Sequence, residues 1–163
     1  EIEDVNLNDW QKAINSNLLS AITLSKEVLK SMKKKRWGRI INLTSTVARE
    51  PAKNMVLSNV TRSGLTSFSK TLSIEIAKYG ITVNTILTGG CETDRFINLV
   101  KKSSKNKKDY LKNLKILAEQ SPMKKIAKPE EFVRLIIFLA STYSSYVNGT
   151  AIAIDGGSSK SIF

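Results

Sequence analysis

Residue types that build many common sites are absent or rare in this chain. It has no histidine and a single cysteine, Cys91, in 163 residues. Zinc and iron–sulfur sites depend on histidine and cysteine ligands, so we expect no metal site. One cysteine also excludes an intramolecular disulfide and is typical of a reducing compartment, which predicts a cytoplasmic protein.

Long apolar segments are absent as well. No run is long enough to span a bilayer, so we expect no membrane partner. Hydrophobic residues still make up 41% of the chain, enough to supply a core, and the length suits one domain over residues 1–163. The sequence begins at Glu1 and not at Met, so we expect that an N-terminal part of the protein is missing from it.

Acidic residues are outnumbered by basic ones, 14 to 26, which gives a formal charge of +12. The longest basic runs are Lys33–Arg36 and Lys101–Lys115. Such runs could attract nucleic acid, anionic lipid or an acidic protein. No nucleic-acid motif accompanies them, and aromatic residues do not interleave with them as stacking would require. A solvated lysine-rich surface is therefore favoured, and a nucleic-acid or membrane-surface binder ranks third among the functions considered.

Periodicity predicts helices and strands in alternation. Apolar residues at spacings of three and four predict helices over Trp10–Met32 and Ser58–Tyr79. A third helix opens at Pro129, with acids in its first turn. The polar stretch 94–127 is predicted to hold one or two exposed helices that form a mobile lid. β-branched runs predict three strands, at Gly38–Leu43, Ile81–Leu87 and Ala151–Ile154.

The helix ends carry their own signals. Asn8 is predicted to cap the first helix. Gly80 is predicted to stop the second, and the Lys33–Arg36 run suits the negative end of the first helix dipole. Strands alternating with helices indicate a parallel α/β sheet with right-handed crossovers. Ligands bind such folds at the carboxyl ends of strands, here Thr44–Thr46 and Thr88–Thr93.

An ordered set of short segments resembles the short-chain dehydrogenase/reductase family. These segments run from about Asp9 to Gly157 and include Gly38–Ser45, Ile81–Gly89, Lys128–Glu131, Phe138–Ser141, Val147–Gly149 and Ile154–Gly157. The resemblance implies the C-terminal part of a doubly wound Rossmann-type parallel sheet, in three layers, α/β/α. It also implies an NAD(P)-dependent oxidoreductase that interconverts a carbonyl and an alcohol. The family's glycine-rich phosphate loop is not in this sequence, so we expect weak or no NAD(P) binding by these residues alone.

The resemblance assigns roles residue by residue. Asn17 matches the family's water-relay asparagine, and the alternative is an ordinary helix-interior residue. Ser45 matches the catalytic serine that contacts the substrate carbonyl, and the alternative is a turn residue at a strand end. Thr93 matches the threonine that contacts the nicotinamide amide, although it could equally cap the next helix.

The turn Thr88-Gly89-Gly90 corresponds to the cofactor-side turn of the family, with Thr88 in place of the usual proline. We predict that these three residues bind the cofactor together with Thr93. What the threonine hydroxyl does there stays open at the level of sequence.

The family's catalytic tyrosine and lysine are replaced. Aligned through Gly64, they fall on Ser58 and Arg62, and none of the four tyrosines occupies the position. A serine hydroxyl is far less acidic than a phenol, no histidine is present as a base, and arginine stays protonated. We predict catalytic roles for both residues, with Arg62 also donating to the cofactor ribose, and expect weak or altered activity. A non-catalytic binding or assembly protein of the same family is the alternative.

The resemblance also bears on partners. The family's usual oligomer contacts correspond to the Trp10–Met32 and Ser58–Tyr79 helices and to the Ala151–Ile154 strand. We therefore expect a homo-oligomer, a dimer or tetramer, that acts on a small carbonyl or alcohol substrate.

Overall fold

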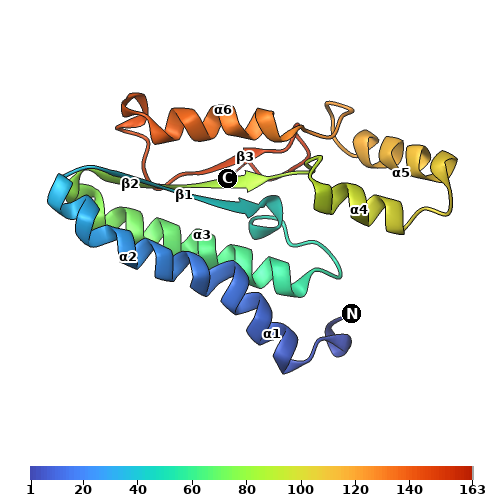
Figure 1. The fold of residues 1–163 in the computed structure, drawn as a ribbon, viewed down its shortest axis with the longest axis horizontal. Helices are drawn as coiled ribbons and strands as arrows, with labels where there is room; N and C mark the ends of the chain where they lie inside the picture. Colours follow the sequence, from blue (N-terminus) through green and yellow to red (C-terminus); the bar gives the residue numbers. More distant parts are fainter. Residues whose placement is uncertain (163) are drawn as a thin grey trace.

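The computed structural model describes residues 1–162, and its centre is a three-stranded parallel sheet (Figure 1). Its strands are β1 (Gly38–Ser45), β2 (Ile81–Thr88) and β3 (Ala151–Ile154), in the order β1-β2-β3. β1 and β2 pair along their full lengths, from Gly38 opposite Ile81 to Ser45 opposite Thr88. The predicted parallel α/β arrangement is confirmed.

Helices cover both faces of this sheet. The α-helices of the described chain are, in order, α1 (Leu7–Ile14), α2 (Ser20–Lys35), α3 (Val56–Ile76), α4 (Asp94–Lys102), α5 (Lys107–Glu119) and α6 (Pro129–Ala140). Figure 1 shows α2 and α3 on one face and α6 on the other, which confirms the three layers. The predicted lid region holds two helices, α4 and α5, and both lie beyond the carboxyl ends of the strands.

Each of the two helix layers packs on the sheet through its own apolar core. Side chains alternate between the faces of a strand, so β2 contributes to both cores. Toward α2 and α3 the core contains Ile40, Leu72, Ile76, Ile81 and Val83. Toward α6 it contains Ile86, Phe132 and Leu139. Helices on both faces explain why β2 is buried from Ile81 to Leu87, as is usual for the centre of a parallel sheet.

Two asparagines join β3 to the sheet. The side chain of Asn84 is almost fully buried, donates to the Val147 carbonyl at 2.8 Å and accepts from the Thr150 N–H at 3.3 Å. Asn148 accepts from the Val83 N–H at 2.9 Å and donates to the Ser73 carbonyl at 3.0 Å. Buried backbone groups outside a ladder need such partners. The pair therefore fixes the loop that sets the position of β3.

The helix-end predictions had mixed outcomes. Asn8 as an N-cap is wrong, because the helix begins at Leu7 and Asn6 accepts from the Asp9 N–H at 3.1 Å. Gly80 is confirmed as the stop after α3, with φ of +71°. A Cβ there would lie 2.5 Å from the Arg36 carbonyl oxygen, so both the backbone angle and the close approach require glycine.

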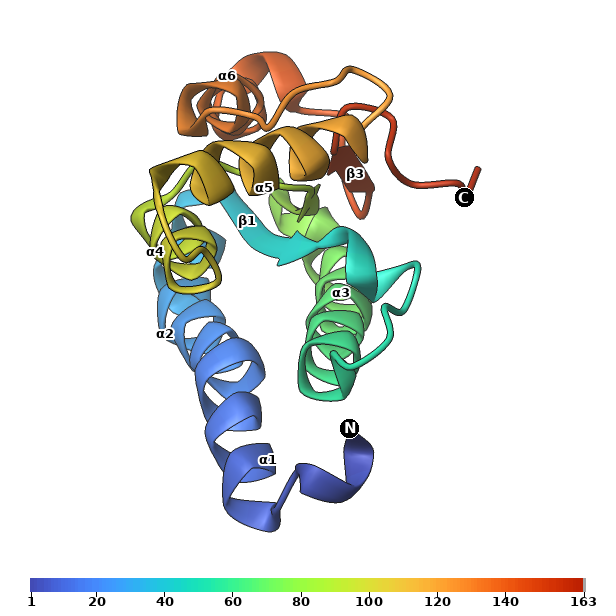
Figure 2. The same cartoon turned by 90° about the vertical axis from the view of Figure 1, so that its right-hand side faces the viewer.

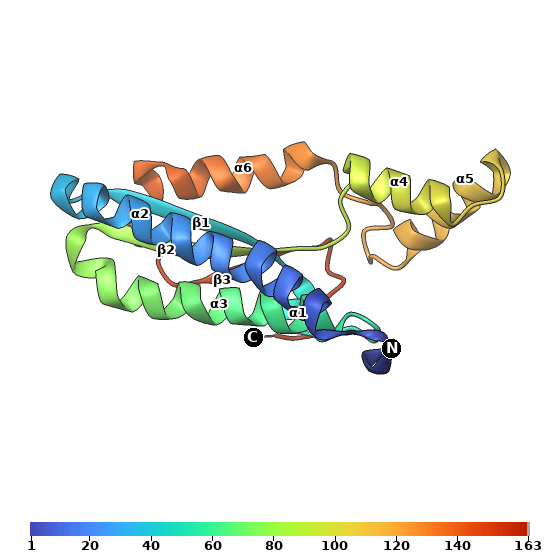
Figure 3. The same cartoon turned by 60° about the horizontal axis from the view of Figure 1, so that its bottom comes forward.

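The first long helix contains a break in its regular winding. Between α1 and α2 the chain forms a π-helical turn, Asn15–Leu19, in which the Ser20 N–H donates to the Asn15 carbonyl. Figures 2 and 3 show α1 and α2 as one continuous helical rod through this turn. The Ser20 hydroxyl donates to the Ser16 carbonyl at 2.7 Å, a back-bond of the kind that bends helices. Wide turns of this type occur often at functional sites.

No helix within residues 1–162 combines the length and the apolar character that crossing a membrane requires.

Candidate active site at the strand ends

A cavity of about 460 Å³ lies at the carboxyl ends of all three strands. Ser45 and Thr46 line it from the end of β1, Thr88–Gly90 from the end of β2, and Ile154–Gly156 from the end of β3. Parallel strands end at the same edge of a sheet, so residues far apart in the sequence meet here. Its remaining lining residues include apolar side chains from outside the sheet, namely Met55, Phe96, Leu117, Met123 and Ile126.

Ser45 is the last residue of β1 and is half-buried at this cavity. Its hydroxyl oxygen accepts from the Val47 N–H at 3.4 Å, near the limit of a hydrogen bond. No described residue accepts its hydroxyl proton. The hydroxyl can therefore donate to a carbonyl oxygen placed in the cavity.

Thr88, which the resemblance aligns with a family proline, has a structural partner for its hydroxyl. Thr88 Oγ1 donates to the Thr44 carbonyl at 2.8 Å, which joins the ends of β1 and β2. The next residue is packed closely, since a Cβ on Gly89 would lie 2.7 Å from the Asp155 Cα. A Cβ on Gly90 would meet only Ile126, at 3.8 Å. The backbone after β2 is thus held in place at Thr88 and Gly89 and is accessible at Gly90.

Replacing Thr88 with valine is expected to lower stability by about 1 kcal/mol, since it removes one part-buried hydrogen bond while keeping the shape. For a chain of this size the melting temperature should fall by roughly 2–4 °C in calorimetry. Thr88→Ser keeps the hydroxyl and is the matched control. An unchanged melting temperature for the valine variant would show that this bond does not stabilise the strand ends.

Thr93 begins the segment that leaves the sheet. Its Oγ1 accepts from the Phe96 N–H at 3.3 Å, so the helix-capping role is present. The hydroxyl proton has no acceptor among the described residues. Capping therefore leaves Thr93 able to donate to a ligand, and its contact with nicotinamide stays a prediction.

Arg62 lies in α3, against the end of β1. Its Nη1 donates to the Leu43 carbonyl at 3.2 Å. Its Nε is buried and has no hydrogen-bond partner within residues 1–162. Burial, and then the nearby charge of Arg95, lower the pKa of the Arg62 guanidinium from its ordinary value. Arginine begins so high that it remains protonated.

The structure does not bring all the predicted catalytic residues to one cavity. Ser58, in the first turn of α3, lines a separate cavity of about 650 Å³ between residues 1–5 and 52–59. Asn17 lies half-buried at the centre of the π-helical turn, and its side-chain amide makes no hydrogen bond to a described residue. That turn packs on α3, where a Cβ on Gly64 would lie 3.3 Å from Leu18. The catalytic roles of Ser58 and Asn17 stay predictions.

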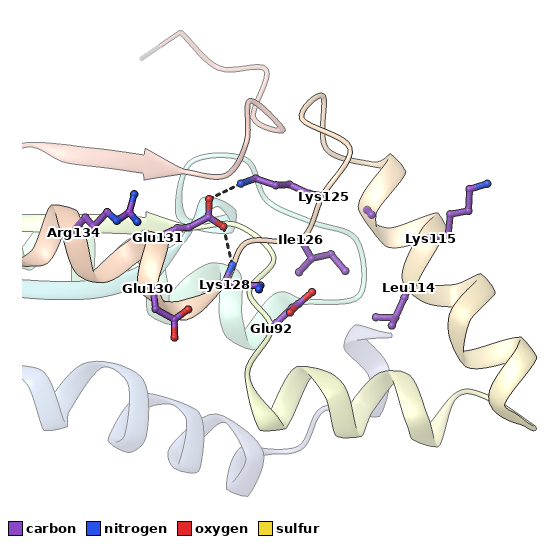
Figure 4. Close-up of a pocket in the computed structure, with 10 residues that line it drawn as sticks. Glu92, Leu114, Lys115, Lys125, Ile126, Lys128, Glu130, Glu131 and Arg134 are labelled. Atoms are coloured by element: carbon purple, nitrogen blue, oxygen red, sulfur yellow. Dashed lines mark hydrogen bonds and ion pairs between the residues drawn. The ribbon is translucent and has the colours of Figure 1, made fainter.

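A third cavity, of about 770 Å³, adjoins the strand-end cavity between α5 and α6 (Figure 4). Lys125, Ile126 and Glu131 line both. Lys125 Nζ donates to Glu131 at 2.5 Å, and the Lys128 N–H donates to the other carboxylate oxygen at 3.0 Å (Figure 4). These hydrogen bonds lower the pKa of Glu131 and favour its charged form. Because Lys125 and Glu131 line both cavities, this charged pair lies where the two meet.

Sequence reasoning missed another residue at this edge. Asp155 lines the main cavity but is held by its own turn, where it accepts from the Gly157 N–H at 3.0 Å and the Ser159 N–H at 2.8 Å. Burial acts to raise the pKa of Asp155, but these hydrogen bonds outweigh it and the net change is downward.

A parallel sheet between two layers of helices, with a cavity at its strand ends, defines a doubly wound α/β protein. A family model described as enoyl-(acyl carrier protein) reductase matches residues 1–159. The chain belongs to the short-chain dehydrogenase/reductase family.

Curated relatives cover most of this chain. The 3-oxoacyl-(acyl-carrier-protein) reductase FabG of Buchnera aphidicola subsp. Schizaphis graminum is 36% identical over 149 residues, which is 91% of this chain and 57% of that protein. The NADPH-dependent reductase BacG of Bacillus subtilis is 35% identical over 164 residues, 98% of this chain and 62% of that protein. The chain thus spans about three fifths of the length of these relatives.

Solved structures agree with the fold. L-sorbose reductase from Gluconobacter frateurii, complexed with NADPH and L-sorbose, matches with a TM-score of 0.94 and 32% identity, over 99% of this chain and 62% of that one. YwfH, an NADPH-dependent reductase involved in bacilysin biosynthesis, matches with a TM-score of 0.91 and 34% identity, over 98% of this chain and 62% of that one. The described sheet and helices therefore correspond to the C-terminal part of the family's Rossmann fold.

Proposed function

We propose that the intact protein is an NAD(P)-dependent oxidoreductase that interconverts a carbonyl and an alcohol. The observation that carries this proposal is the free Ser45 hydroxyl in a cavity of about 460 Å³ bounded by Thr88, Gly89 and Gly90. Relatives that share the fold are NADPH-dependent reductases, which favours NADPH over NADH.

The residues present fit the nicotinamide end of such a cofactor. Arg62 Nε is a buried donor without an acceptor, as expected of a group that meets a ligand. Thr93 keeps a free hydroxyl proton, and Gly90 leaves its backbone accessible. In this proposal Arg62 donates to ribose hydroxyls. The nicotinamide lies against Thr88, Gly89, Gly90 and Thr93. Bound NAD(P)H supplies the hydride.

Ser45 would act directly on the substrate. Its hydroxyl donates to the carbonyl oxygen and stabilises the negative charge that develops there. Ser58 cannot replace the acidity of a phenol, and Arg62 cannot relay a proton. The proton on the product oxygen then comes from water, with Asn17 as the proposed anchor of that water. Without a positioned acid, turnover is slow.

The replaced tyrosine and lysine also favour a second candidate, a non-catalytic member of the family that binds a nucleotide or acts through assembly. Such a protein would keep the fold and the Arg62 donors without turnover. Binding and turnover measured separately distinguish the two functions.

A homo-oligomer in the cytoplasm is the proposed setting. Large apolar side chains are exposed on the helices that the family uses for assembly, including Leu24 on α2 and Ile74 on α3, at 68% and 69% exposure. Apolar surface of this kind is typical of interfaces. The single cysteine suits a reducing compartment.

The intact protein, made from its complete reading frame, should bind NADPH and oxidise it slowly in the presence of ketones or aldehydes. Calorimetry measures the binding, and NADPH absorbance measures the turnover across a panel of carbonyl compounds. Binding without turnover would support a non-catalytic protein that binds a nucleotide. The absence of binding would contradict the oxidoreductase and leave only a protein that acts through assembly.

A further inference from the structure

Three cations gather around one aromatic ring at the amino ends of the strands, the edge of the sheet opposite the candidate active site. Lys33 Nζ lies 4.9 Å from the centre of that ring, which belongs to Tyr79. Lys78 Nζ lies 5.5 Å and Arg36 Cζ 5.8 Å from the same centre. The end of α2 supplies two of these cations, and the turn between α3 and β2 supplies the third. Figure 1 shows both segments at the end of the molecule that lies away from α4 and α5.

The backbone brings these two segments together. A Cβ on Gly80 would lie 2.5 Å from the Arg36 carbonyl oxygen, so the chain after α2 and the chain after α3 are in close contact. Arg36 has a φ of +55°, a left-handed conformation that glycine adopts more readily than arginine. Its side chain nevertheless reaches the Tyr79 ring. The fold therefore sets the positions from which the three cations converge.

No acidic residue within these segments offsets the charge. Residues 33–39 and 77–80, which we call the basic edge, contain six Lys or Arg residues and no Asp or Glu. None of the ion pairs among residues 1–162 involves a cation of the basic edge. The face of an aromatic ring attracts cations and partly offsets their mutual repulsion, which allows them to gather here. The field at this edge is positive and attracts anions.

An exposed tryptophan lies within the basic edge. Trp37 is 46% exposed, and the Arg39 guanidinium lies 5.1 Å from the centre of its ring. Arg39 is itself held by backbone carbonyls at the start of β1 and the end of α6. No aromatic residue interrupts the Lys33–Arg36 run in the sequence, but the fold places Tyr79 among its cations and Trp37 follows it directly. Single-stranded nucleic acid matches this combination, because its phosphates attract cations and its bases stack on aromatic rings.

We propose that the basic edge binds single-stranded nucleic acid, with Lys33, Arg36 and Lys78 on the phosphates and Trp37 stacked on a base. An anionic membrane would also meet the cations, but a segment that lies in a membrane surface buries a whole apolar face. Trp37 is the one large apolar side chain exposed among the residues of the basic edge, and one ring is enough to stack a base. The site lies opposite the strand-end cavity and does not depend on the proposed oxidoreductase activity.

The test measures binding of the intact protein to a fluorescein-labelled oligothymidylate of about 20 nucleotides, by anisotropy over a series of salt concentrations. Arg36→Gly should weaken binding about 3- to 10-fold and reduce the slope of log K against log salt by about 0.7, the share of one phosphate contact. Glycine suits the left-handed backbone, so this variant removes the charge and keeps the fold. Trp37→Leu should weaken binding about 5-fold or more with little change in slope.

The matched control is Lys112→Ala, which removes an equal charge from the exposed surface of α5 and should change the dissociation constant less than about 2-fold. Vesicles of phosphatidylserine and phosphatidylcholine replace the oligonucleotide in a parallel series. No binding of the oligonucleotide, binding to vesicles alone, an affinity that either substitution leaves unchanged, or an equal loss in Lys112→Ala would overturn the proposal. NADPH binding should be the same in wild type and Arg36→Gly, so this proposal and the oxidoreductase can fail separately.

Discussion

The double substitution Ser58→Tyr with Arg62→Lys is expected to speed carbonyl reduction by the intact protein about 10²–10⁴-fold, the usual contribution of a positioned acid. Ser58 lies in the first turn of α3, and the resemblance to the family predicts that it replaces the catalytic tyrosine. A phenol with its pKa lowered by a neighbouring ammonium can give up a proton near neutrality, which a serine hydroxyl cannot. Initial rates of NADPH oxidation with a substrate that the wild type accepts slowly provide the measurement.

The matched control is Ser58→Phe with Arg62→Lys, which adds the ring and the lysine without the phenolic hydroxyl. It should remain at the wild-type rate or below. Equal rates for the tyrosine and phenylalanine variants would mean that the α3 position is not the acid site. That result would fit the location of Ser58 in a cavity separate from that of Ser45.

Ser45→Ala is expected to lower kcat for carbonyl reduction about 10²–10³-fold, the typical cost of one donor to a developing oxyanion. Stability should change little, because the hydroxyl accepts only a long bond from the Val47 N–H, at 3.4 Å. Steady-state kinetics with a calorimetric melting curve separates the two effects. Ser45→Thr keeps the hydroxyl and should retain much of the rate. A kcat unaffected by alanine would remove Ser45 from the catalytic site.

Local signals predicted much of the fold. The strands Gly38–Ser45, Ile81–Thr88 and Ala151–Ile154 were found nearly to the residue, because each is a short β-branched run between turn residues. Gly80 was found because a left-handed stop has a strong residue preference. These features depend on a few neighbouring residues.

Features that depend on tertiary contacts were missed. The π-helical turn Asn15–Leu19 has no periodic signature in the sequence. The hydrogen bonds of Asn84 to Val147 and Thr150 join positions more than 60 residues apart, and an asparagine inside a strand gives no hint of them. The resemblance supplied the candidate site, since the alternation of predicted strands and helices gave only the edge of the sheet at which to look.

Transfer of deuterium from labelled NADPH to a carbonyl carbon tests the central claim most directly. The intact protein is incubated with NADPH deuterated at its transferable position and with the best substrate of the panel, and the alcohol is analysed by mass spectrometry. We predict an alcohol one mass unit heavier with wild type, in an amount that falls about 10²–10³-fold with Ser45→Ala. An enzyme that binds NADPH tightly and yet gives no labelled alcohol would contradict the oxidoreductase account.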